Sequence, residues 1–257
     1  MNRIYLLLIS VVVISISCSS TSKLIEQGNY DKAINQLVEK LAGKKNKKTK
    51  DVRNLELAFK KAQDKDLRNE ADLKLTKEES SWELIYDIYQ NIDRRQDLIQ
   101  PLLPLVSKEG YQAKFQFVNV AELKKESKDN SIGYFYKSAV QLIEEARKLN
   151  NQEAARSAFE FLNKIDLLSS NYKDVRQLKA MAKELGTDYY LVKVLNNTFK
   201  IFPANLEENL LMMDVSGLST NWKQFDTRKQ SERNYKYQIV MNLLIRQCSK
   251  CDSRICF

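Results

Sequence analysis

The chain has 257 residues, enough for one large domain or two modest ones, and its 43% hydrophobic and 29% charged residues are typical of a globular protein. Only 6 glycines and 3 prolines favour a mainly helical fold, because turns and bulges consume both residues. Histidine is absent, which excludes Ser-His and Cys-His catalytic arrangements and argues against an enzyme. The formal charge of +9 favours anionic partners.

The N-terminus has the features of an export signal. A short positive start, residues 1–3, precedes an apolar run of 13 residues from Ile4 to Ile16. A membrane-spanning helix needs about 20 apolar residues, so the run fits the hydrophobic part of a signal peptide better than a transmembrane segment. The run ends beside Cys18, and the small residue Ser17 precedes this cysteine.

Ser17-Cys18 resembles the end of the lipobox of bacterial lipoproteins, although Ser15 stands where a branched apolar residue is usual. The resemblance implies that residues 1–17 are a cleaved signal peptide and that residues 18–21 form a lipidated N-terminus. Cys18 would then carry a covalent diacylglycerol and a fatty acyl chain such as palmitate, which together hold a protein at a membrane.

Two serines, Ser19 and Ser20, follow the cysteine in place of the Asp that retains many lipoproteins in the inner membrane. The expected location is therefore the outer membrane of the cell envelope, on either its periplasmic or its surface face. The alternative is an ordinary secretory signal whose cleavage region contains a cysteine.

Residues 22–186 have the apolar spacing of helices, and we expect a helical-repeat domain there. The stretch GNYDKAINQLVEKL resembles the second half of a tetratricopeptide repeat, with Gly28 at the turn, Ala33 at the helix contact and Leu37 at the large apolar position. A small residue lets two helices approach closely, and a large residue fills the groove beside it. The alternative is an irregular helical domain that shares only these packing rules.

Two further stretches repeat this spacing more loosely. Trp82, Ile85 and Tyr89 match the first helix of a repeat, and its partner is expected at residues 95–106, where two prolines must kink or end the helix. The second stretch places seven residues on matching faces of two helices: Phe135, Ala139, Leu142, Ala146, Ala155, Phe159 and Leu162.

Separate helices are expected at 51–62 and 67–75, and a last one at 175–185 with Gly186 as its C-cap. As a whole, residues 22–245 resemble uncharacterised lipoproteins of Gram-negative bacteria, in which helix pairs precede a β-rich region. That resemblance implies no activity.

Residues 187–247 are expected to form a small β-rich region. Residues 188–197, 221–226 and 235–243 are rich in β-branched and aromatic side chains and predict strands, and a short helix is expected after Pro203. In the last strand, alternation predicts one half-buried face made of Tyr235, Tyr237, Ile239, Met241 and Leu243. The expected fold is mainly α, with tetratricopeptide-like helical hairpins in an irregular solenoid and a small C-terminal antiparallel β region (α+β).

The tail, residues 248–257, contains Cys248, Cys251 and Cys256. Their spacing is half of a zinc site, but zinc needs four ligands and Asp252 is a poor substitute for the fourth. A disulfide is more natural outside the cytoplasm, and a redox role or no role at all also remain open.

The run GKKNKKTK contains Lys44, Lys45, Lys47 and Lys48. It is either a solvated loop or a contact with anionic lipid headgroups or glycan, since it lies about 25 residues from Cys18. It has no aromatic residue on which a base can stack, so nucleic acid is not an expected partner.

The sequence predicts no catalytic residue, no metal site and no cofactor apart from the lipid. Its acidic pairs are adjacent on helices and point about 100° apart, and it has no phosphate-binding loop or nucleophile elbow. The function expected is a lipid-anchored, non-enzymatic scaffold for an envelope protein partner. The alternative is a structural envelope lipoprotein that contacts cell-wall glycan through its basic surface.

Overall fold

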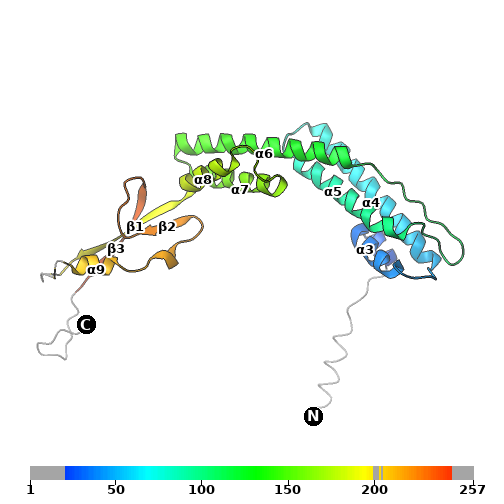
Figure 1. The fold of residues 1–257 in the computed structure, drawn as a ribbon, viewed down its shortest axis with the longest axis horizontal. Coiled ribbons are helices and arrows are strands. Elements are labelled where there is room, and N and C mark those ends of the chain that lie inside the picture. Colours follow the sequence, from blue (N-terminus) through cyan, green and yellow to red (C-terminus); the bar gives the residue numbers. More distant parts are fainter. Residues whose placement is uncertain (1–20, 199–202, 204, 245–257) are drawn as a thin grey trace, which may run out of the picture. The chain divides into compact units, whose positions relative to one another are not determined.

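The computed structural model describes residues 21–198, 203 and 205–244 (Figure 1). In this part of the chain the backbone forms eight α-helices, labelled α2 to α9, three β-strands and two short 3-10 turns. The strands all come after α8. The predicted mainly helical fold with a small C-terminal β region is confirmed. The chain divides into two compact units between Tyr134 and Phe135, inside α6, whereas helices give way to strands after Gly186.

The first unit is built from four helices and the first half of a fifth: α2 (Thr21–Glu26), α3 (Tyr30–Leu41), α4 (Thr49–Thr76), α5 (Ser81–Ile99) and α6 (Ala121–Leu149). Helices α2, α3 and α4 pack against one another, and α4 packs against α5. Gly28 joins α2 to α3 with a φ of 76°, in the left-handed region that glycine enters without strain.

The main hydrophobic core of the first unit lies among α2, α3, the first half of α4 and the end of α5. Ala33 and Leu37, which the repeat-like spacing placed at the helix contact, are both 0% exposed, so the predicted packing is confirmed. Leu105 and Ala113, from the segment between α5 and α6, complete this core.

A second core lies along α5 and is built around Ile85, Tyr89, Ile92 and Val120. Val120 belongs to the extended segment before α6. The Gln96 side chain holds this segment on α5, because its amide accepts from Val118 N at 2.6 Å and donates to Val118 O at 3.0 Å.

Two helix predictions for this unit are wrong. The helices expected at 51–62 and 67–75 are one helix, α4, of 28 residues. No glycine or proline lies between them, so nothing in the chain stops the helix. The helix expected at 95–106 does not form: α5 continues to Ile99, a 3-10 turn follows at Gln100–Leu102, and the chain then leaves helical geometry. The helix that packs on α5 is therefore α4.

The second unit begins with the second half of α6 and continues with α7 (Gln152–Leu168) and α8 (Val175–Gly186), which pack against each other. The Asn151 side chain caps α7 by accepting from Glu153 N and Ala154 N. The matching faces predicted for α6 and α7 are confirmed for five of the seven residues, since Leu142 and Phe159 are only half-buried. The five buried residues are Phe135, Ala139, Ala146, Ala155 and Leu162.

The last residue of α8 is Gly186, and Thr187 takes the C-cap position, so the predicted role of Gly186 as the C-cap is wrong. The position instead requires glycine because there is no room for a side chain. A Cβ atom on Gly186 would lie 2.9 Å from Trp222 Cζ3, and few heavy atoms in a close-packed interior approach so closely.

The second unit ends in a three-stranded sheet of β1 (Asp188–Asn196), β2 (Lys223–Asp226) and β3 (Tyr235–Leu243), in the order β2-β1-β3. The strands were predicted in the right places, but the antiparallel pairing expected for them is wrong, because both neighbours run parallel to β1. Parallel strands need a crossover between them. Helix α9 (Leu206–Leu211) lies in the connection from β1 to β2 and packs on β1.

The prediction of one half-buried face along β3 is also wrong in detail. An irregularity in the pairing sets Tyr235 opposite Tyr189 and Tyr237 opposite Tyr190, so the two tyrosines of β3 lie on opposite faces of the sheet. Tyr237 is 46% exposed and stacks on Tyr190 with ring centroids 4.8 Å apart.

Candidate functional site

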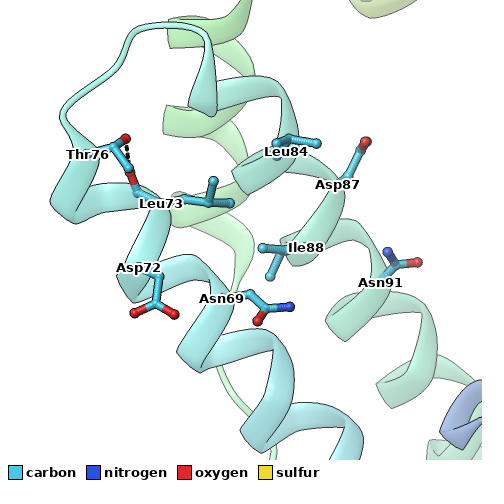
Figure 2. Close-up of a pocket in the computed structure, with 8 residues that line it drawn as sticks. All are labelled: Asn69, Asp72, Leu73, Thr76, Leu84, Asp87, Ile88 and Asn91. Carbon is cyan, nitrogen blue, oxygen red and sulfur yellow. Dashed lines mark hydrogen bonds between the residues drawn. The ribbon is translucent and has the colours of Figure 1, made fainter. Parts of the chain in front are cut away.

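A groove runs along the surface between α4 and α5 in the first unit and has a volume of about 520 Å³. Four residues of each helix line it, at positions i, i+3, i+4 and i+7: Asn69, Asp72, Leu73 and Thr76 from α4, and Leu84, Asp87, Ile88 and Asn91 from α5 (Figure 2). This spacing places the four residues of each helix on one face. Each of the two antiparallel helices therefore lines the groove with one stripe of four residues, and the two stripes have the same spacing.

The apolar floor of the groove is continuous with the second core. Leu73 and Ile88 are half-buried and pack against that core. Figure 2 shows the two side chains pointing toward each other across the gap between the helices. Leu84 extends this floor and is 54% exposed. A single exposed leucine is ordinary, but apolar side chains that lie together in a groove mark a candidate interaction site.

The polar lining consists of two carboxylates, two amides and a hydroxyl, with no lysine or arginine. Asp72 and Asp87 come from different helices and lie at the two sides of the floor (Figure 2). The Thr76 hydroxyl donates to Leu73 O of α4 at 2.8 Å and also lies 3.2 Å from Ser81 Oγ of α5. Apolar floors with a few polar groups at the sides are typical of binding sites.

Behind the groove, Tyr89 ties α5 to α4 through a polar network. Its hydroxyl donates to Glu70 Oε1 at 2.7 Å and accepts from Lys74 Nζ at 3.2 Å, while Lys74 Nζ lies 2.6 Å from Glu70 Oε1. Burial acts to raise the pKa of Glu70, but the hydrogen bonds from Lys74 and Tyr89 outweigh it and the pKa is lowered. The network fixes the spacing of the two helices that form the groove.

A buried arginine fixes the other end of the pair. Arg95 of α5 is 3% exposed and forms ion pairs with Asp66 of α4 and Asp31 of α3. Burial raises the pKa of Asp66, and the Arg95 guanidinium only partly opposes this shift. Three helices thus meet at one cation, which makes the groove a preformed surface.

The four lysines predicted as a basic contact lie in the loop between α3 and α4. Lys44, Lys45 and Lys48 are exposed, whereas Lys47 is half-buried and its ammonium donates to Lys44 O at 2.7 Å. Lys47 O also accepts from Lys108 N at 2.9 Å, which attaches the loop to the segment after α5. The structure therefore assigns Lys47 to holding the loop and presents the other three lysines to solvent.

The other predicted site residues lie outside the described residues: Cys18, Cys248, Cys251 and Cys256. Among residues 21–198, 203 and 205–244, no cluster of three or more histidine, cysteine, aspartate or glutamate side chains is arranged to hold a metal ion. No helix in this described part is both long enough and apolar enough to cross a membrane.

The groove was not predicted from the sequence. A signal for it exists in SWELIYDIYQ, where Leu84 and Ile88 form a second apolar stripe beside the buried one of Ile85, Tyr89 and Ile92. A helix with an apolar stripe wider than one neighbour can cover is expected to contact something else. Comparisons of the chain with protein-family models, curated proteins and solved structures found no match.

Proposed function

We propose that the protein is a lipid-anchored, non-enzymatic scaffold of the bacterial cell envelope that holds a partner protein in the α4–α5 groove. The observation that carries the proposal is the pair of facing stripes on α4 and α5, in which Leu84 of the α5 stripe is 54% exposed. The helices that present these stripes are fixed from behind by Tyr89 and Arg95. A rigid, partly apolar surface loses little conformational entropy when a partner binds.

The proposed anchor is Cys18, and the location proposed is the outer membrane. Helix α2 begins at Thr21, three residues after this cysteine, and its Leu24 and Ile25 are part of the main core. A lipid on Cys18 would therefore hold the first unit close to the membrane surface, with no long tether. Globomycin, which inhibits the lipoprotein signal peptidase, should cause a slower-migrating precursor to accumulate. If no precursor appears, the lipid anchor is excluded.

Site-specific photo-crosslinking in living cells tests the scaffold directly. A photoreactive phenylalanine analogue replaces Leu84 in the full chain, and after irradiation we expect one discrete crosslinked species that contains a second protein. The matched control places the same analogue at Leu75 of α4, which is 79% exposed but does not line the groove. The absence of any crosslink from Leu84, or an identical pattern from both positions, would reject the groove as a docking surface.

The second candidate function is a contact with cell-wall glycan through the basic loop. The observation that favours it is the exposure of Lys44, Lys45 and Lys48 on one short loop. Co-sedimentation of the unlipidated protein with purified cell wall distinguishes the two. Strong co-sedimentation that depends on these lysines supports the glycan contact, and crosslinking from Leu84 supports the scaffold.

A further inference from the structure

The groove lies in the acidic part of a basic chain. Residues 69–91, which span both sides of the groove and the turn between them, contain six carboxylates and two lysines, whereas the whole chain carries +9. One lysine and one carboxylate of this segment, Lys74 and Glu70, pair with each other behind the groove. The groove lining itself adds Asp72 and Asp87 and no cation. The charge around the groove is therefore opposite in sign to that of the chain as a whole.

We infer that the groove binds an amphipathic helix whose apolar stripe is flanked by lysine or arginine. This inference rests on the proposed function and specifies the chemistry of the partner. The apolar stripe would lie on Leu73, Leu84 and Ile88, and the basic flanks would face Asp72 on one side and Asp87 on the other. Positive charge on the partner steers it toward the acidic groove and selects against acidic helices.

The geometry favours a helix over an extended peptide. Each stripe covers eight residues, which is about 10.5 Å or two helical turns at a rise of about 1.5 Å per residue. The walls are α-helices, whose backbone groups are bonded within each helix, so they offer no strand edge with which an extended peptide can pair. A helix satisfies its own backbone and presents side chains at i, i+3, i+4 and i+7, which is the spacing of the groove.

The experiment uses the full chain in detergent and three labelled synthetic peptides of about 20 residues, a length at which helices become stable. All three carry leucine at i, i+3, i+4 and i+7. The first has lysine flanks, the second has glutamate flanks, and the third has lysine flanks and a central proline that breaks the helix. Fluorescence anisotropy gives each dissociation constant at low and at high salt.

We expect the lysine-flanked peptide to bind at least about tenfold more tightly than either of the other two, and high salt to reduce this difference. Leu84→Ala and the double change Asp72→Asn/Asp87→Asn should each weaken its binding. The matched controls are Leu75→Ala and Asp64→Asn, which change an exposed leucine and an exposed aspartate of α4 outside the groove lining. These controls should bind the peptide as the unchanged protein does.

Three results would overturn the inference: equal binding of the lysine-flanked and glutamate-flanked peptides, undiminished binding of the proline-containing peptide, or binding that Leu84→Ala does not alter. The failure of the inference remains distinguishable from failure of the proposed function. If crosslinking from Leu84 still captures a protein while the lysine-flanked peptide does not bind, the groove holds a partner of different chemistry. If neither is seen, both proposals fall. A captured species with the mass of two copies of this chain would identify the occupant as a second copy and would also contradict the inference.

Discussion

Gly186 and Trp222 approach each other so closely that a Cβ atom on the glycine would lie 2.9 Å from Trp222 Cζ3. The contact joins the end of α8 to the residue just before β2. Trp222 also packs edge-on against Phe159 of α7, with ring centroids 5.3 Å apart, and Arg156 of α7 donates to Gly186 O at 2.9 Å. The helices and the sheet of the second unit therefore meet at a glycine that no larger residue can replace without movement.

We predict that Gly186→Ala destabilises the second unit by about 1–3 kcal/mol, the usual cost of overpacking a well-filled site. Urea unfolding followed by tryptophan fluorescence measures the change. The matched control is Gly133→Ala in α6, where a Cβ would meet nothing within 4 Å. This control should stabilise the helix by about 0.5–1 kcal/mol, because alanine is the better helix former. Equal effects of the two changes would show that the approach to Trp222 is unimportant.

Glu70 should make stability fall at acidic pH. Hydrogen bonds from Lys74 and Tyr89 hold its pKa below the ordinary value of 4.5, against the effect of burial. A carboxylate with a depressed pKa stabilises the fold above the unfolded value and loses this contribution as the pH falls through the folded value. Glu70→Gln should therefore cost about 1–3 kcal/mol at pH 7 and reduce the loss of stability below pH 4.5. Urea unfolding across a pH series measures both effects. If Glu70→Gln loses as much stability below pH 4.5 as the unchanged protein does, Glu70 is not the group responsible for the loss.

Asp66 should behave in the opposite way. Burial holds its pKa above 3.8 despite the Arg95 guanidinium. The folded state therefore binds the proton more tightly than the unfolded state, and the contribution of Asp66 to stability declines as the pH rises from 3.8 through the folded value. Arg95→Met, which leaves the half-buried Asp66 without its cation, should cost about 3 kcal/mol at neutral pH, the lower end of the usual range for a broken buried pair. Part of this loss should be regained on acidification.

The control for Arg95 is the double variant Arg95→Met/Asp66→Asn. It removes the uncompensated charge, so it should be more stable at neutral pH than Arg95→Met alone and should lose the recovery on acidification. Asp31, the second partner of Arg95, has a side chain that is 52% exposed, and water can solvate it when the arginine is removed. If the double variant is no more stable than Arg95→Met alone, the unpaired charge of the half-buried Asp66 is not the source of the lost stability.

Adjacent residues of α5 should separate folding from binding. Ile85 is 2% exposed in the second core, so Ile85→Ala should cost about 2–5 kcal/mol of unfolding free energy. Leu84 is 54% exposed, and Leu84→Ala should change stability by less than about 1 kcal/mol. Thermal unfolding followed by circular dichroism measures both. A large loss with Leu84→Ala would make this leucine part of the fold and weaken its assignment to the groove.

The accuracy of the sequence-based predictions follows from the range of the interactions that decide each feature. Ala33 and Leu37 were placed correctly because small and large residues at helical spacing are a local packing signal. The strand at Asp188–Asn196 was also found from local composition. The direction in which this strand pairs was not predicted correctly. It depends on the path of the connection of more than twenty residues between β1 and β2, and the sequences of the strands do not reveal that path.

The groove illustrates a second kind of limit. Leu84 and Ile88 have the periodicity of core residues, and only their position relative to α4 shows that no element of the described first unit covers Leu84. The length of α4 has a similar origin. Residues 63–66 are polar and suggest a gap between two helices, but without glycine or proline the backbone continues through them. Periodicity thus identifies apolar faces, and tertiary packing decides which of them stay open.

The loop between α3 and α4 yields the last prediction. Replacing Lys44, Lys45 and Lys48 with glutamine should weaken binding of the unlipidated protein to vesicles that contain anionic lipid, since each lysine near such a surface contributes about 1 kcal/mol. The matched control makes the same charge change at three exposed lysines of α4: Lys60, Lys61 and Lys65. Vesicle sedimentation at low salt should show a larger loss for the loop variant, because a short loop can bring its three charges to one surface together. Equal losses would mean that only the net charge matters. Lys47→Gln alone should differ from both triple variants, because the Lys47 ammonium is bonded to Lys44 O within the loop. Its removal should loosen the loop and should not take away a charge that faces the vesicle.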